Sequence, residues 1–448
     1  MDAARGPRFI GRQACAECHP DEDRLWRGSH HDLAMQEAND RTVLGDFDDT
    51  RFSHAGVTST FFRRDGGFFV RTEGPDGEPA EFEIRYTFGA VPLQQYLVEL
   101  EGGRLQALTV CWDTRPASEG GQRWFHLYPD EEIGPDDPLH WTGPFQNWNY
   151  MCAECHSTDV KKNYNAVEDG YATSWAEIDV SCEACHGPGS EHVEWGKAVA
   201  LEQTPPEVER LGLVVRLTDP GRGTWIIDRE TDKGIRLAPP VETAELETCA
   251  RCHSRRTALT DDYEFGRPLE DSHRLALLDE ELYYADGQIL EEVYVHGSYL
   301  QSRMHAAGVT CSDCHDPHSL DLLFPGDRVC DRCHTAAKFD TAEHHFHQPD
   351  TEGSHCVDCH MPPRKYMVVD PRHDHSLRIP RPDLSLSLGT PNACTDCHRD
   401  KSVRWAAGKV AEWYGPDRRA EPHYGEAIWA ARNRRSDAGA KLLSLLAD

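Results

Sequence analysis

The chain has no long hydrophobic run. Hydrophobic residues make up 38% of its 448 positions, and the mean hydropathy is −0.65, so the apolar content is below that of a typical globular protein. No window approaches the roughly 20 apolar residues of a membrane-spanning helix. The first residues, MDAARGPRFIGRQACAECHP, also lack the apolar core of a signal peptide. The sequence therefore predicts no transmembrane segment.

Basic residues are scarce relative to acidic ones. The chain has 47 Lys and Arg against 77 Asp and Glu, which gives a formal charge of −30. This negative charge disfavours binding to nucleic acid and favours a partner with a cationic docking surface. An alternative is that the acidity serves solubility, for example in a salty habitat.

Common catalytic signatures are missing as well. The sequence contains no Ser–His–Asp arrangement, no phosphate-cradling glycine loop and no paired-carboxylate pattern. None of the enzyme classes that depend on them is indicated.

What the sequence does contain is C-x-x-C-H, the attachment signature of c-type haem, in which two thiols bond to the porphyrin and the adjacent histidine ligates iron. Zinc knuckles, redox dithiols or a disulfide framework also use paired cysteines, but none needs a histidine directly after the second cysteine. The motifs use all but one of the 17 cysteines. We therefore expect eight covalently attached haem c groups. Numbered along the chain, motifs 1 to 8 are Cys15–Cys18–His19, Cys152–Cys155–His156, Cys182–Cys185–His186, Cys249–Cys252–His253, Cys311–Cys314–His315, Cys330–Cys333–His334, Cys356–Cys359–His360 and Cys394–Cys397–His398.

Haem attachment also predicts the compartment. The covalent bonds form outside the cytoplasmic membrane, so we expect a periplasmic or extracellular protein whose leader has been removed or is not part of this sequence. Because each macrocycle is a large apolar body, the haems account for the low hydrophobic content. We expect the protein without haem to be poorly folded.

The sixth ligand of each iron must come from another histidine. The chain has 25 histidines, and those outside the motifs outnumber the haems, so the count leaves open whether one haem has a free distal position. His318 follows the motif 5 histidine, His315, by three residues. The same local turn holds it on the His315 side of the ring, so we expect His318 to ligate a neighbouring haem. His305, ahead of the motif, is a second candidate for this role.

The wide gap between motifs 1 and 2 predicts an inserted β module. FEIRYTF (82–88) alternates apolar and polar residues, as a half-buried strand does. STFFRRDGGFFVRT and QYLVELEGGRLQALTVCW read as hairpins that turn at Asp65–Gly67 and at Gly102–Gly103. Cys111, the one cysteine outside the motifs, lies in a strand of this module and is expected to be a buried structural thiol.

The rest of the chain is expected to be mainly helical and loop-rich, with little regular structure around packed haems. GRGTWIIDRETDKGIRL (221–237) indicates one more hairpin, and the sequence after residue 400 indicates helices, either a pair or the start of a repeat array. We divide the chain into an N-terminal segment with the first motif (1–49), the antiparallel β module (50–128), a haem core with seven motifs (129–400) and a helical tail (401–448).

Several stretches resemble the multihaem cytochromes related to cytochrome c554, including large bacterial members with tetratricopeptide-like repeats. The resemblance covers nearly all of residues 9–400, although CVDCHMP alone is shared with pentahaem nitrite reductases and octahaem hydroxylamine oxidoreductases. The stretches are WRGSHHDLAM (26–35), GGQRWFHLYPDE (120–131), NWNYMCAECHSTDVKKNY (147–164), CEACHGPGSEHV (182–193), GVTCSDCHDPHSL (308–320), HCVDCHMP (355–362) and DHSLRIPRPDLS (374–385).

The resemblance also implies distal iron ligands. The better matches are His31, His192, His305, His318 and His375. One of the three histidines in HHFH (344–347) is implied as well, and our choice is His345. Competing for the remaining positions are His54, His126, His140 and His273.

Two functions follow from the motifs. Bis-histidine haems are coordinatively saturated, so a close series of them would carry electrons between redox partner proteins. Alternatively, one haem with an open or labile distal site would reduce nitrite, hydroxylamine or a sulfur oxyanion. No motif ends in the lysine of pentahaem nitrite reductases, and Lys365 and Tyr366 are the nearest polar candidates for a catalytic role. Self-assembly into a filament is not predicted, because the charge of −30 opposes close association unless salt screens it.

Overall fold

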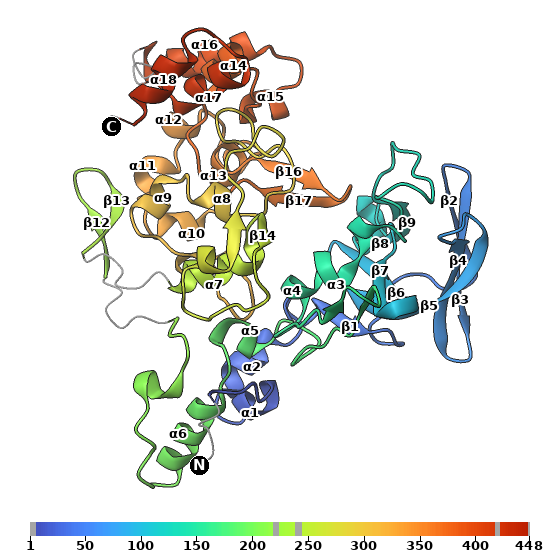
Figure 1. Cartoon of the computed structure of the whole chain (residues 1–448). Helices are drawn as coiled ribbons and strands as arrows, with labels where there is room; N and C mark the ends of the chain where they lie inside the picture. The colour runs from blue at the N-terminus through green and yellow to red at the C-terminus, as the bar shows by residue number, and fades with distance from the viewer. Residues whose placement is uncertain (1–5, 218–223, 238–243, 417–421, 447–448) are drawn as a thin grey trace.

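The computed structural model describes residues 6–217, 224–237, 244–416 and 422–446. It combines one large sheet with short helices and small hairpins (Figure 1). The sheet lies on one side of the molecule, and the C-terminal helices gather at another end (Figure 1).

The sheet is antiparallel, with the order β2-β3-β4-β5-β6-β8-β9, while β1 pairs with β5 and β7 with β6. The predicted turn at Asp65–Gly67 is confirmed: Asp65 and Gly66 both have positive φ, as a two-residue hairpin turn requires. The second hairpin, at Gly102–Gly103, is confirmed by the pairing of β6 with β7. The strands are β1 Met35–Glu37, β2 Thr50–His54, β3 Val57–Arg64, β4 Gly67–Glu73, β5 Pro79–Phe88, β6 Leu93–Leu100, β7 Arg104–Ala107, β8 Val110–Asp113 and β9 Arg123–His126.

Aromatic rings form the core against this sheet. Phe47 meets Phe61, Tyr96 and Trp124 edge-on at 5.4–5.5 Å, and Phe61 stacks on Trp124. Cys111 is fully buried in a smaller neighbouring cluster, as predicted for a structural thiol, and burial raises its thiol pKa well above the usual value.

Most helices outside the sheet are short. They are α1 Arg12–Ala16, α2 Pro20–Trp26, α3 Trp148–Met151, α4 Ala153–His156, α5 Cys182–His186, α6 Ser190–Ala200, α7 Ala244–His253, α8 His296–Tyr299, α9 Arg303–Ala306, α10 Arg328–Asp331, α11 Ala336–Phe339, α12 Ala342–His345, α13 Cys356–His360, α14 Pro382–Leu388, α15 Ala393–Cys397, α16 Val403–Tyr414, α17 Tyr424–Arg432 and α18 Ala438–Ser444. The last three make up the predicted helical tail. No helix in the described ranges is both long and apolar enough to span a membrane.

Four two-stranded hairpins and several 3₁₀ turns connect the helices. The hairpin predicted for residues 221–237 is confirmed by β12 and β13, although residues 221–223 lie outside the described residues. The hairpin strands are β10 Tyr164–Asn165 with β11 Gly170–Tyr171, β12 Trp225–Asp228 with β13 Lys233–Arg236, β14 Arg256–Ala258 with β15 His273–Leu275, and β16 Pro363–Tyr366 with β17 Asp370–His373. The 3₁₀ turns are η1 Glu101–Gly103, η2 Ala117–Glu119, η3 Pro144–Gln146, η4 Glu209–Gly212, η5 Leu269–Asp271 and η6 Cys311–Asp313.

Candidate haem-binding sites

Each motif lies on or beside a single helical turn. In motif 5, for example, the backbone N–H of His315 donates to the carbonyl of Cys311 at 2.9 Å. Residues at i, i+3 and i+4 share one face of such a turn, so the two thiols and the histidine are presented together. Every cysteine is unpaired, and within the described ranges no group of three or more metal-binding side chains forms.

Four motif histidines face a second histidine across a gap of the size that an iron requires. A metal–imidazole bond is about 2 Å long, so two imidazoles on opposite sides of one iron have ring centres roughly 6 Å apart. The observed separations lie between 6.0 and 6.3 Å. The pairs are His19 with His192, His253 with His31, His360 with His344, and His398 with His347. These residues fit a haem iron held by two histidines.

Hydrogen bonds orient several of these rings. When the Nδ1–H of an imidazole donates to a backbone carbonyl, the tautomer is fixed and Nε2 is left to bind a metal. Among the motif histidines and the predicted distal candidates, five make this contact at 2.6–2.9 Å. With their acceptors they are His156 (Ala34), His192 (Leu211), His347 (His345), His360 (Arg378) and His375 (His373).

The other motif histidines differ in their surroundings. His186 interacts electrostatically with His318, His19 and His192, and His375 does so with both His315 and His253. By contrast, the aromatic ring packed against the motif 2 histidine is Phe88, edge-on at 5.4 Å. Phe339 contacts the motif 6 histidine in the same way at 5.5 Å. Among the described residues, no second histidine ring packs against either of these two.

Cysteines of different motifs lie near one another, and their sulfurs would be thioethers once haem is attached. Thiols are hydrogen-bonded between motifs 1 and 3, 2 and 4, 4 and 5, and 6 and 7. Electrostatic contacts between thiols join motifs 3 and 4, 5 and 6, and 7 and 8. All eight motifs thus belong to one connected series.

Comparisons with known proteins agree with this geometry. The family described as cytochrome c554 and c-prime matches residues 142–187, which hold motifs 2 and 3. The solved structure of the outer cell wall cytochrome OcwA superposes with a TM-score of 0.59 and 17% identity, over 97% of this chain and 96% of that one. The chain therefore shares the fold of OcwA, and part of it matches the cytochrome c554 and c-prime family. A second structure, octaheme sulfite reductase MccA from Wolinella succinogenes (form II), gives a TM-score of 0.36 at 15% identity over 83% of this chain and 58% of that one, too low to indicate a shared fold. No curated protein sequence matches the chain.

Four of the histidines predicted as distal candidates contact side chains other than motif histidines. His54 and His126 stack on each other at 4.2 Å in the β module, where they line a hollow together with His140. His273 uses both ring nitrogens, one at 2.8 Å from the Ser272 hydroxyl and one at 3.0 Å from the Glu154 carboxylate, so neither is left for iron.

Two further predictions concern histidines close to the motifs. The structure places His344 and His347 of HHFH, rather than the chosen His345, against motif histidines. The Nε2 of His345 is buried and makes no hydrogen bond within the described residues. His305 packs against Tyr299 at 5.7 Å.

The polar pair proposed for catalysis lies on β16. The Tyr366 hydroxyl donates to the carbonyl of Glu291 at 3.1 Å, and burial raises its pKa to about 12. The guanidinium of Arg372 covers its ring. Lys365 is exposed. The tyrosine is thus committed to a structural contact.

Buried carboxylates fasten one motif to another. Glu183, inside motif 3, is almost fully buried and accepts hydrogen bonds from the backbone N–H groups of Ile10, Gly11 and Gly189 at 2.8–2.9 Å. Two of these precede motif 1, so one side chain holds motifs 1 and 3 together. These backbone donors satisfy the hydrogen-bonding capacity of a carboxylate that water does not reach.

The same arrangement recurs further along the chain. Glu245 on α7, the motif 4 helix, accepts from the N–H of Ser312 in motif 5 at 2.7 Å. Asp327, ahead of motif 6, accepts from the N–H of Cys356 in motif 7 at 2.9 Å. Sequence patterns gave no sign of these links, because their partners are distant along the chain.

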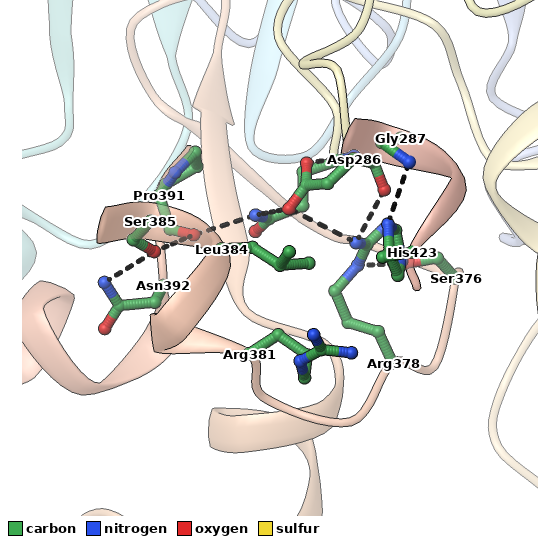
Figure 2. Close-up of polar contacts among 12 residues, drawn as sticks. Asp286, Gly287, Ser376, Arg378, Arg381, Leu384, Ser385, Pro391, Asn392 and His423 are labelled. Atoms are coloured by element: carbon green, nitrogen blue, oxygen red, sulfur yellow. Dashed lines mark hydrogen bonds and ion pairs between the residues drawn. The ribbon is translucent and has the colours of Figure 1, made fainter. Parts of the chain in front are cut away.

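A polar network positions motifs 7 and 8 (Figure 2). Arg378, whose carbonyl accepts from His360, directs its guanidinium at the Ser376 hydroxyl (2.8 Å) and the Asp286 carbonyl (3.2 Å). The Asp286 carboxylate lies 3.9 Å from the same guanidinium. Residues 376–378, which follow motif 7 in the chain, are thereby held against the 286–288 loop.

The loop also reaches the motif 8 helix. Gln288 donates to the Pro391 carbonyl at 2.8 Å, and Asn392 beside it caps α15 by accepting from the Thr395 N–H at 3.1 Å. Such a cap satisfies a helix N–H that would otherwise lack a partner.

Proposed function

We propose that the cytochrome carries eight haems and conducts electrons through them between redox partners. The observation that carries the proposal is the series of neighbouring motif cysteines, linked by hydrogen bonds or electrostatic interaction in the order motif 1, 3, 4, 5, 6, 7, 8, with motif 2 beside motif 4. Attached haems would then be neighbours along the whole line. Haem supplies the one-electron chemistry, and the chain fixes spacing, ligands and surrounding charge.

The proposed distal ligands follow from the facing rings. His192, His31, His344 and His347 would ligate the haems of motifs 1, 4, 7 and 8. We extend the proposal to His318 for motif 3 and His375 for motif 5, which interact electrostatically with those motif histidines. His318 would then serve a haem other than that of its own neighbour His315, because its partner belongs to another motif.

The partners are proposed to be redox proteins outside the cytoplasm. OcwA is named an outer cell wall cytochrome, which agrees with the compartment that haem attachment requires. The charge of −30 favours partners with a cationic surface. A cationic electron donor should accordingly reduce the protein faster than an anionic one of equal potential, and the difference should shrink as salt rises.

A second candidate function is reduction of a small molecule at an open haem. The motif 2 and motif 6 histidines favour it, since each meets a phenylalanine edge rather than a histidine. Carbon monoxide added to the reduced protein tests this candidate. Binding to one or two haems per chain supports an open site, and no spectral change rules it out.

Conduction is tested by NMR of the partly reduced holoprotein. If the haems exchange electrons within one chain, each haem methyl group gives a single averaged signal per oxidation stage, at every protein concentration. Averaging that disappears on dilution means exchange between chains, and separate oxidised and reduced signals mean isolated haems. Either result contradicts the proposal.

A further inference from the structure

Motif 4 contacts more motifs than a position in a simple line would require. Its first cysteine is hydrogen-bonded to Cys311 of motif 5, and its second to Cys155 of motif 2. Cys185 of motif 3 interacts electrostatically with both of its cysteines. Three motifs therefore converge on motif 4, and motif 2 stands to the side of the line from motif 1 to motif 8.

Motifs 2 and 4 contact each other through a sulfur atom from each side, and we call this contact the joint. The Cys155 sulfur lies 3.9 Å from the Cys252 carbonyl oxygen, and the Cys252 sulfur lies 3.9 Å from the Glu154 carbonyl oxygen. Helices α4 and α7 thus meet with their haem-bearing cysteines side by side.

Charged side chains close the joint. The Glu154 carboxylate from motif 2 lies 3.5 Å from Arg251 inside motif 4, 3.1 Å from Arg256 just after it, and 3.0 Å from His273. Arg256 also approaches the Cys155 sulfur to 3.5 Å. The side chains of Arg251 and Arg256 are only 10% and 11% exposed, so solvent screens these charges little.

We infer that motif 4 is a branch point of the electron path and that Glu154, Arg251 and Arg256 fasten motif 2 to it and set the reduction potentials of the two haems there. The inference rests on the proposed conduction. Oxidation adds positive charge to a haem, so a nearby carboxylate lowers its reduction potential and a nearby guanidinium raises it. These positioning residues would give the haems of motifs 2 and 4 reduction potentials that differ from those of the other six haems.

The chain offers a matched control for this role. Motifs 1 and 2 share the letters CAECH, so Glu17 occupies in motif 1 the position that Glu154 occupies in motif 2. Glu17 is exposed, and a charge in water is well screened.

The test is a spectroelectrochemical titration of four holoprotein variants. Glu154→Gln should raise the potentials of two haems and leave the others unchanged, while Arg256→Gln should lower the same two. Glu17→Gln should move none. A His31→Met variant identifies the motif 4 haem, because a methionine ligand raises the potential of its own haem.

The two substitutions at the joint separate charge from structure. A packing defect would shift both variants in one direction, whereas opposite shifts require the charges themselves. Shifts of equal sign, no shifts, or equal shifts in Glu17→Gln would overturn the inference. If electrons fail to exchange within the native chain, the proposed conduction falls instead, whatever these variants do.

Discussion

In the sheet, aromatic rings such as Phe61 and Trp124 pack directly on one another, and residues on successive strands form a dry core. In the motif region the helices are often a single turn long, and buried carboxylates such as Glu183 bridge segments far apart in sequence. The first region contains its own apolar core. The second carries the haem-attachment motifs, so we expect its stability to depend on haem in a way that the sheet's does not.

We expect the largest difference between the two regions in the protein made without haem. We expect the strands β2 to β9 to keep slow backbone hydrogen exchange, while residues 129–400 exchange nearly as fast as an unfolded chain. Hydrogen exchange with mass spectrometry measures both regions in one sample, with the holoprotein as control. Equal protection in the two regions would break the contrast.

The second largest difference is expected when single histidines are removed from the two regions. His192→Ala removes the ring facing His19, so one haem should change from low-spin to high-spin, as seen by EPR. His54→Ala, in the β module, is the matched control and should leave all haem spectra unchanged, because its partner is His126. A loss of low-spin haem in the control would place a ligand in the sheet.

Core truncation in the sheet should leave the haems unaffected. Phe61 is fully buried, and replacing it with alanine should destabilise the module by about 3–5 kcal/mol through lost burial and a cavity. Thermal unfolding followed by far-UV circular dichroism reports the loss. Shifted haem potentials in this variant would show that the two regions are coupled.

The smallest expected effect is a pH dependence confined to the sheet. Burial alone would raise the Asp113 pKa, but hydrogen bonds and charge from Arg115 outweigh it and lower the pKa. The stabilisation is therefore present above the ordinary carboxyl pKa and is lost as the pH falls through the lowered one. Asp113→Asn should cost about 1–3 kcal/mol at pH 7.

The matching measurement for Asp113 is made in acid. At a pH below the folded-state pKa, the native protein and the Asp113→Asn variant should be equally stable in urea unfolding. A difference that persists there would mean that the contact depends on shape and not on charge.

The local features of this protein could be predicted from its sequence, and the long-range ones could not. The C-x-x-C-H repeats and the glycine-containing turns, such as Asp65–Gly67, are fixed by a few adjacent residues. The facing of His192 toward His19 depends on how distant segments pack, which no local pattern encodes. The segment HHFH illustrates this limit.

There, helix α12 ends at His345 and Phe346 adopts a left-handed conformation with φ 58°. The chain reverses at that point, so His344 and His347 face different motifs, 7 and 8. Spacing within the sequence gave no means of choosing between them and His345.

The central claim is that most irons are held between two histidines. Low-temperature EPR of the fully oxidised holoprotein, with spins counted against total iron, measures this most directly. The account predicts at least six low-spin ferric haems per chain, one for each proposed pair. A majority of high-spin haems would contradict the histidine pairing, and with it the proposed conduction through these haems.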